Sequence, residues 1–213
     1  MIYAENILIC IAVPLVISLW FVRRGARMFV ASFLTGMLVC LLAAYISGFI
    51  IAAGGFLEEE GAIFISPIIE EIMKWLPLVL YLFLLEPENE GIILAAVGIG
   101  AGFATFENCC YILTIGAESF AYIMIRGFAV GVMHIVSIFA LGMGLVLARQ
   151  FRVLSFSAVI GTLSLSMSFH ALYNLLVSEP GVSTTIGYSL PLLAACLLYI
   201  LYRRIQKNAA GDV

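Results

Sequence analysis

Residues 66–77 read SPIIEEIMKWLP, which places three charges inside a stretch that is otherwise apolar. A carboxylate near the middle of a bilayer costs about 3 kcal/mol or more unless it faces protein or water. Glu70 lies four residues before Lys74 and Glu71 lies three before it, so on a helix the lysine reaches either carboxylate. Because successive side chains point about 100 degrees apart, one glutamate is held by the lysine and the other faces elsewhere. The stretch therefore predicts an intramembrane site.

The same stretch predicts where its helix starts. Ser66 suits the N-cap position and Pro67 suits the first helical position, so we expect the helix to begin just before the glutamate pair. The helix dipole favours negative charge near that end. The acidic residues 58–60, which precede the stretch, are expected to form a solvated loop.

The composition identifies the class of protein. The chain has 213 residues, of which 64% are hydrophobic and 11% charged, a balance typical of integral membrane proteins. A net charge of -3 gives no indication of a nucleic-acid partner. The five cysteines are odd in number and lack Cys-x-x-Cys spacing, so we expect small core residues rather than a zinc site or disulfides. The N-terminal apolar run lacks a basic leader and is expected to be a retained span.

Seven apolar runs approach the length of about 20 residues that a membrane-spanning helix needs. We therefore predict an all-α, polytopic transmembrane bundle of about seven spans. It forms a single integral membrane domain over residues 1–213. The predicted spans lie near residues 6–22, 28–54, 64–85, 91–115, 120–148, 153–177 and 186–202.

Basic residues predict the orientation of the bundle. They follow the first, fifth and seventh runs, and with seven spans these three places share one side of the membrane. The positive-inside rule makes that side cytoplasmic, so the N-terminus is expected outside and the C-terminus in the cytoplasm. The residues are Arg23, Arg24, Arg27, Arg149, Arg152, Arg203, Arg204 and Lys207, eight of the ten basic residues.

Glycines indicate which helices lie at the centre. Small residues allow membrane helices to approach closely, and they are concentrated in the fourth and fifth runs. We therefore expect these two helices to be central. The glycines concerned are Gly98, Gly100, Gly102, Gly127, Gly131, Gly142 and Gly144.

Four further polar groups lie at about the depth of the glutamate pair. Glu107, His134, His170 and Asn174 fall in the fourth, fifth and sixth runs. Counting 1.5 Å per helical residue places the ionisable groups within roughly 6 to 12 Å of the outer boundary. His170 and Asn174 are four residues apart and share a helix face. Arg126 is expected to be an interfacial anchor. Four helices are thus predicted to bring polar groups to one level.

This set suits hydrolysis of a peptide bond in two ways. A carboxylate can take a proton from water, imidazoles can polarise a carbonyl, and an amide such as Asn174 can donate to the developing oxyanion. Two histidines and a glutamate are also a recurring zinc shell, with another glutamate as base. In that case Glu107, His134 and His170 would bind zinc. The residues alone leave both mechanisms open, and leave open which of Glu70 and Glu71 is the base.

These motifs resemble the PrsW family of intramembrane proteases, relatives of the CAAX prenyl endopeptidases and bacteriocin-processing enzymes. The resemblance rests on four ordered features, which cover runs three to six. The prenyl endopeptidases typically carry Arg one residue further from the glutamate pair and His in place of Glu107. The features are Glu70-Glu71-x-x-Lys74, Phe103-x-x-x-Glu107-Asn108, His134 and His170-x-x-x-Asn174.

The resemblance implies an activity and a substrate. Members of the family are expected to perform site-1 cleavage of a membrane-anchored anti-sigma factor on its extracytoplasmic side, which starts a stress response. The lipid bilayer is the medium of the reaction, and the chain is expected in the cell membrane. Asn174 stands where some members have Asp, which leaves its role and any metal requirement open. The predicted site residues are Glu70, Glu71, Lys74, Glu107, His134, His170 and Asn174.

Two other classes of function fit parts of the pattern. Buried carboxylates and histidines also form proton relays and ion sites in transporters, but transporters commonly show two related halves, which this sequence lacks. A membrane scaffold of the same fold without catalysis is the other alternative. The complete set of acid, base and amide groups favours an enzyme over both.

Overall fold

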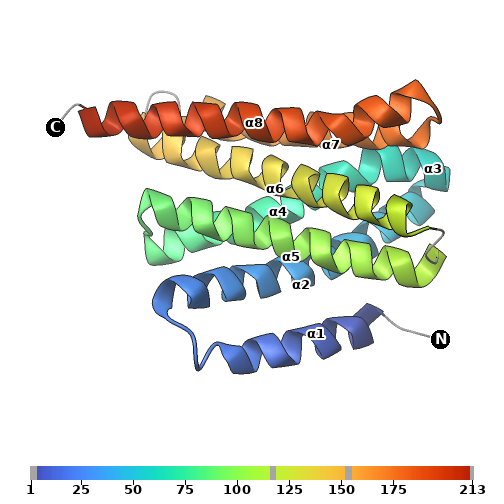
Figure 1. Ribbon diagram of the computed structural model, residues 1–213, viewed down its shortest axis with the longest axis horizontal. Helices are drawn as coiled ribbons and strands as arrows, with labels where there is room; N and C mark the ends of the chain where they lie inside the picture. Colours follow the sequence, from blue (N-terminus) through green and yellow to red (C-terminus); the bar gives the residue numbers. More distant parts are fainter. Residues whose placement is uncertain (1–3, 116–118, 152–154, 212–213) are drawn as a thin grey trace.

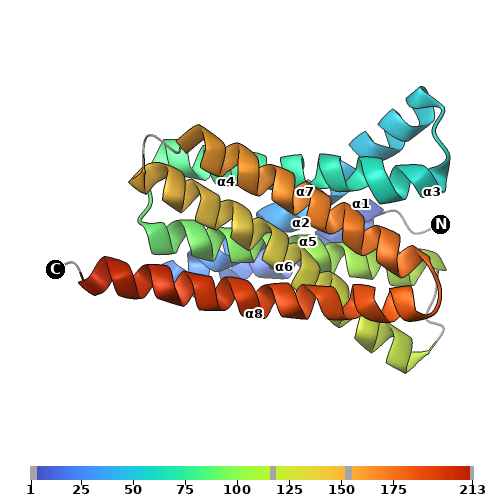
Figure 2. The same cartoon turned by 90° about the horizontal axis from the view of Figure 1, so that it is seen from above.

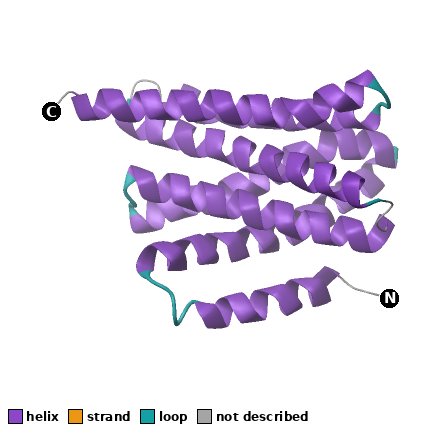
Figure 3. Cartoon of the chain, in the orientation of Figure 1, coloured by secondary structure: helices purple, strands orange, loops and turns teal. Residues whose placement is uncertain are grey.

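The computed structural model describes residues 4–115, 119–151 and 155–211, and these residues form helices joined by short connections, without a strand (Figure 3). The all-α prediction is confirmed. The helices are α1 (Ala4–Ser18), α2 (Arg24–Gly54), α3 (Glu58–Glu60), the π-helix η1 (Gly61–Ile65), α4 (Ser66–Leu85), α5 (Asn89–Ile115), α6 (Phe120–Gln150), α7 (Ser155–Ser178) and α8 (Val182–Gly211).

The helices run back and forth along one axis (Figures 1 and 2). The start of α2 and the ends of α6 and α8 lie at one end of the bundle, on the left in Figure 1. These helix ends carry the basic residues on which the predicted orientation depends, including Arg24, Arg149 and Arg203. The start of α4 and the end of α5 lie at the opposite end. Which end faces the cytoplasm remains a prediction.

Five helices in the described part of the chain are long and apolar enough to cross a membrane, namely α2, α5, α6, α7 and α8. The chain is therefore an integral, multi-pass membrane protein. The other two predicted spans differ from these for separate reasons. Helix α1 has 15 residues, shorter than a full crossing, and α4 has 20 residues but carries the three charges of the opening motif. The count of seven spans remains a prediction.

The expected helix start at Ser66 is wrong. Ser66 has helical φ and ψ of −56° and −46°, and the helix continues backwards through η1 to Glu58. Pro67 therefore lies inside a continuous helix, where its ring lacks an N–H and crowds the carbonyl four residues earlier. The wider π-turn of η1 immediately before it accommodates this defect. The acidic residues 58–60 are exposed as expected, but they are helical rather than a loop.

Helices α5 and α6 are central, as predicted. Within their most apolar segments 61% and 67% of residues are buried, against 11% in α7 and α8. A Cβ on Gly102 would collide with the Phe33 backbone carbonyl of α2, and one on Gly100 would press against α6 at His134. The prediction fails for Gly127 and Gly131, where an added Cβ would meet open space.

Candidate active site

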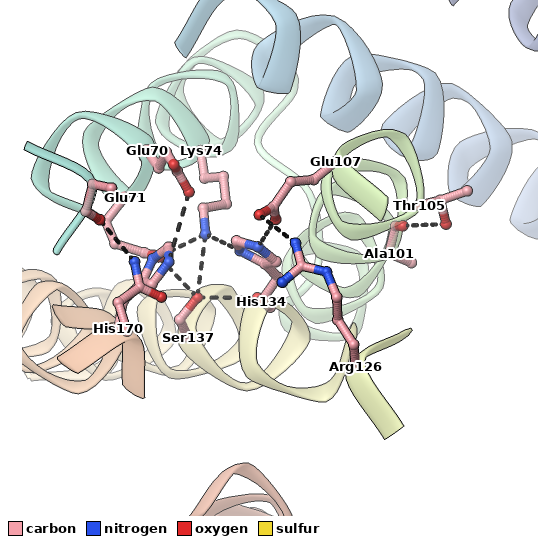
Figure 4. Close-up of polar contacts among 12 residues, drawn as sticks. Glu70, Glu71, Lys74, Ala101, Thr105, Glu107, Arg126, His134, Ser137 and His170 are labelled. Atoms are coloured by element: carbon pink, nitrogen blue, oxygen red, sulfur yellow. Dashed lines mark hydrogen bonds and ion pairs between the residues drawn. The ribbon is translucent and has the colours of Figure 1, made fainter. Parts of the chain in front are cut away.

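A buried ion pair lies at the centre of the polar cluster (Figure 4). Lys74 Nζ lies 2.6 Å from Oε1 of Glu71, and both side chains are fully buried. Ser137 of α6 donates its hydroxyl proton to the same Oε1 at 3.2 Å. Of the two spacings that the sequence allowed, the lysine uses the three-residue one. Glu71 is therefore the glutamate that Lys74 holds.

His170 of α7 connects the two glutamates. Its Nδ1 lies 2.8 Å from Oε1 of Glu71, and its Nε2 lies 3.7 Å from Oε2 of Glu70. A carboxylate that accepts the proton of one ring nitrogen fixes the tautomer and leaves the other nitrogen as a ligand or acceptor. Glu71 thus orients His170 toward Glu70.

The two glutamates differ in how well they are satisfied. Oε2 of Glu70 is buried and has no hydrogen-bond partner among the described residues. Oε2 of Glu71 also lacks one, but that carboxylate already takes contacts from Lys74, Ser137 and His170 through Oε1. Buried polar groups normally have partners. Glu70 is consequently the carboxylate with a coordination position to offer.

His134 of α6 joins the ion pair to the third glutamate. Its Nδ1 lies 3.0 Å from Lys74 Nζ, and its Nε2 contacts Oε2 of Glu107 on α5. The ring is fully buried and packs against Phe103, with ring centroids 4.7 Å apart. The His134 and His170 rings are perpendicular, with centroids 5.0 Å apart.

Glu107 lies at the accessible edge of the cluster, with 34% of its side chain exposed. Arg126 of α6 approaches its Oε1 to 3.9 Å and lies over the Tyr111 ring at 3.3 Å from the centroid. The interpretation of Arg126 as an interfacial anchor missed this: its side chain turns inward, toward Glu107 (Figure 4).

Asn174 contacts the helix defect rather than the ionisable groups. Its Nδ2 donates to the carbonyl of Ala62 at 3.0 Å, and Ala62 lies in η1. Carbonyls in a π-turn are poorly served by the regular helical ladder, so the amide ties α7 to the segment that leads into α4. Donation from Asn174 to an oxyanion would require this bond to break.

The structure can be tested for fit to a metal ion. Glu70, His134 and His170 each offer a ligand atom, and these atoms lie within 4.8 Å of one another. Two imidazoles and a carboxylate are a common catalytic zinc shell, and the unpartnered Oε2 of Glu70 supports the fit. His134 can join only if Lys74 or Glu107 yields one of its nitrogens. Glu107, which the sequence placed in this set, is not part of it.

The sequence interpretation missed one further member of the network. Ser137 contacts Glu71 and also accepts from Lys74 at 3.4 Å. It lies three residues after His134, so both side chains share one face of α6. That spacing was a usable signal, although serines are common in membrane helices.

Comparison with known proteins identifies a relationship over most of the chain. A family model described as PrsW family intramembrane metalloprotease matches residues 24–202. No curated protein and no solved structure matches.

Proposed function

The chain belongs to the PrsW family of intramembrane metalloproteases, and on that premise we propose a division of labour among the residues of its cluster. The family supports an intramembrane peptidase, and the proposal concerns how this chain performs that reaction. One observation carries it: ionisable side chains from α4, α5, α6 and α7 meet in a single cluster inside an apolar bundle. Such groups are retained in membrane helices chiefly for function.

The buried part of the cluster is the support of the site. Glu71 takes contacts from Lys74, Ser137 and His170, so we assign it to orienting His170. Lys74 neutralises the Glu71 charge and faces Nδ1 of His134. None of these groups has to change its protonation state during hydrolysis. Breaking a buried pair by removing one partner is costly, which suits a structural role.

Glu70, His134 and His170 are the proposed metal ligands. The donor chemistry favours zinc, although softness and geometry alone do not select it over neighbouring divalent ions. When bound, the ion would supply Lewis acidity to a water molecule and to the scissile carbonyl. The unpartnered buried oxygen of Glu70 and the outward nitrogen of His170 support this assignment.

Glu107 is the proposed general base. It is the carboxylate of the cluster with the most exposed side chain, so water and substrate can reach it. In the proposed reaction the water oxygen attacks the carbonyl carbon while Glu107 takes a water proton. The C–N bond then breaks, and Glu107 returns the proton to the leaving amine. His134, which contacts Glu107, holds the carboxylate in place.

The proposed substrate is a single-span protein whose helix unwinds near the extracytoplasmic interface. A peptide bond inside a helix is shielded by its own hydrogen bonds, so local unwinding has to precede hydrolysis. The cluster lies toward the end of the bundle opposite the basic helix ends, which supports an extracytoplasmic site under the predicted orientation. By resemblance to the family, the substrate class is a membrane-anchored anti-sigma factor, and the reaction is site-1 cleavage in a stress response.

The test uses purified protein in liposomes with single-span reporters carrying anti-sigma-factor juxtamembrane segments. We expect the wild type to cleave a reporter and a chelator to stop it. Glu70→Gln and His170→Ala should both be inactive, whereas Glu59→Gln, which changes an exposed carboxylate of α3, should remain active. Full activity in both site variants would contradict the proposal.

A further inference from the structure

A small pocket lies between α5 and α6 beside the cluster. Its volume is about 30 Å³, close to the roughly 30 Å³ that one water molecule occupies in the liquid. The hydroxyls of two of its tyrosines lie 3.0 Å apart and close one wall. The residues that define it here are Asn108, Tyr111, Tyr122, Ile123, Arg126 and Gly127.

The pocket is continuous with the proposed catalytic residues. Asn108 follows Glu107 directly in α5. Arg126 lines the pocket and also approaches Oε1 of Glu107 to 3.9 Å. A ligand group in the pocket would therefore lie next to the carboxylate that is proposed to act on water.

Two buried polar atoms of the pocket residues have no hydrogen-bond partner in the described part of the chain. One is a donor, Nε of Arg126, and the other an acceptor, Oδ1 of Asn108. Unpaired buried polar atoms are rare in folded proteins and call for an explanation. A donor and an acceptor together complement a peptide group, which offers one carbonyl oxygen and one N–H.

Gly127 keeps the pocket open. A Cβ built at this position meets no atom within 4 Å, so the absence of a side chain is not needed for helix packing. The glycine instead leaves room for a group from outside. A volume of about 30 Å³ admits a hydrogen, a methyl or a hydroxymethyl group, but not a branched or aromatic side chain.

We propose that this pocket is a substrate subsite, which binds the unwound backbone next to the scissile bond and selects a small residue, Gly, Ala or Ser. Asn108 and Arg126 hold the peptide group, and Gly127 and Ile123 set the size limit. The inference rests on the proposed peptidase function and adds its sequence preference. Pockets discriminate by about 10 to 200-fold for each added methylene.

The experiment uses the full chain in liposomes with a library of single-span reporters randomised over eight juxtamembrane positions. Cleavage sites are read by mass spectrometry of the products. For the wild type we expect one position, fixed relative to the scissile bond, to be enriched at least about tenfold in Gly, Ala and Ser. Ile123→Ala should widen the pocket and admit Val or Leu at that same position, a gain that a misfolded variant cannot show.

The opposite change and its control complete the design. Gly127→Val should lower cleavage of reporters with Ala at that position about tenfold or more and spare those with Gly. Gly161→Val, at an equally open glycine of α7, should leave the profile unchanged. If the wild type cleaves but both pocket variants keep its residue profile, the subsite is overturned and the peptidase stands. If the wild type cleaves no reporter, the proposed function falls, and the subsite with it.

Discussion

The cluster has two parts with opposite properties. Around Glu71 and Lys74 every side chain is buried, and one carboxylate oxygen collects three polar contacts. Around Glu107 and Arg126 the side chains are partly exposed, the contacts are longer, and buried polar atoms remain unpaired. Preorganised networks position groups, whereas unpaired groups are available to bind something. The comparison assigns support to the first part and chemistry and recognition to the second.

The largest expected effect tests the boundary between the two parts. Glu70→Gln and His170→Ala should each abolish metal binding and lower the cleavage rate by about 10⁴-fold or more, because a ligand and the chemistry of the ion are lost together. The measurement is element analysis of purified protein with a reporter assay. If Glu107→Gln loses the metal and Glu70→Gln keeps it, the sequence-based ligand set with Glu107 is correct instead.

A large effect on stability is expected from the buried part. Lys74→Met leaves the Glu71 charge without its partner in an apolar interior, which costs about 3–5 kcal/mol. Thermal unfolding in detergent should show a clear loss of stability. Combining Lys74→Met with Glu71→Gln removes both charges and should restore much of it. A double variant no more stable than the single one would show that Glu71 does more than balance the lysine.

Glu107→Gln tests the exposed part. Gln keeps the size and polarity of the side chain but cannot take a proton, so cleavage should fall by about 10² to 10⁴-fold. Metal content and thermal stability should stay near wild type, because the side chain is partly exposed and outside the converging ligand set. Glu59→Gln on α3 is the matched control. A stable, metal-loaded variant with full activity would remove Glu107 from the mechanism.

The buried part was easier to predict from sequence than its detailed contacts. Hydropathy identifies the spans because a bilayer demands long apolar helices, and equal depth predicted that the polar groups of four helices would be gathered. The sequence could not choose between Glu70 and Glu71 for Lys74, since both helical spacings are within reach. That choice depends on where His170 and Ser137 lie across the helix interface.

The exposed part was harder because it depends on direction rather than depth. Whether Arg126 turns toward lipid headgroups or toward Glu107 is decided by the Tyr111 ring under its guanidinium, a contact between two helices. The π-turn escaped prediction for a related reason. Ser66 and Pro67 suit a helix start equally well, and only the continuous helix from Glu58 shows that Pro67 is internal.

Asn174 gives the smallest expected effect and separates two roles for one amide. If it serves only to hold the Ala62 carbonyl of η1, Asn174→Ala loses one hydrogen bond, worth about 0.5–1.5 kcal/mol, and cleavage should fall no more than about tenfold. Ser178→Ala is the matched control, since Ser178 also donates to a backbone carbonyl at 3.0 Å from the same helix. An oxyanion donor would instead cost about 10² to 10³-fold in kcat with stability like the control. That result would require Asn174 to leave Ala62 during the reaction, and would place it with the exposed part rather than the support.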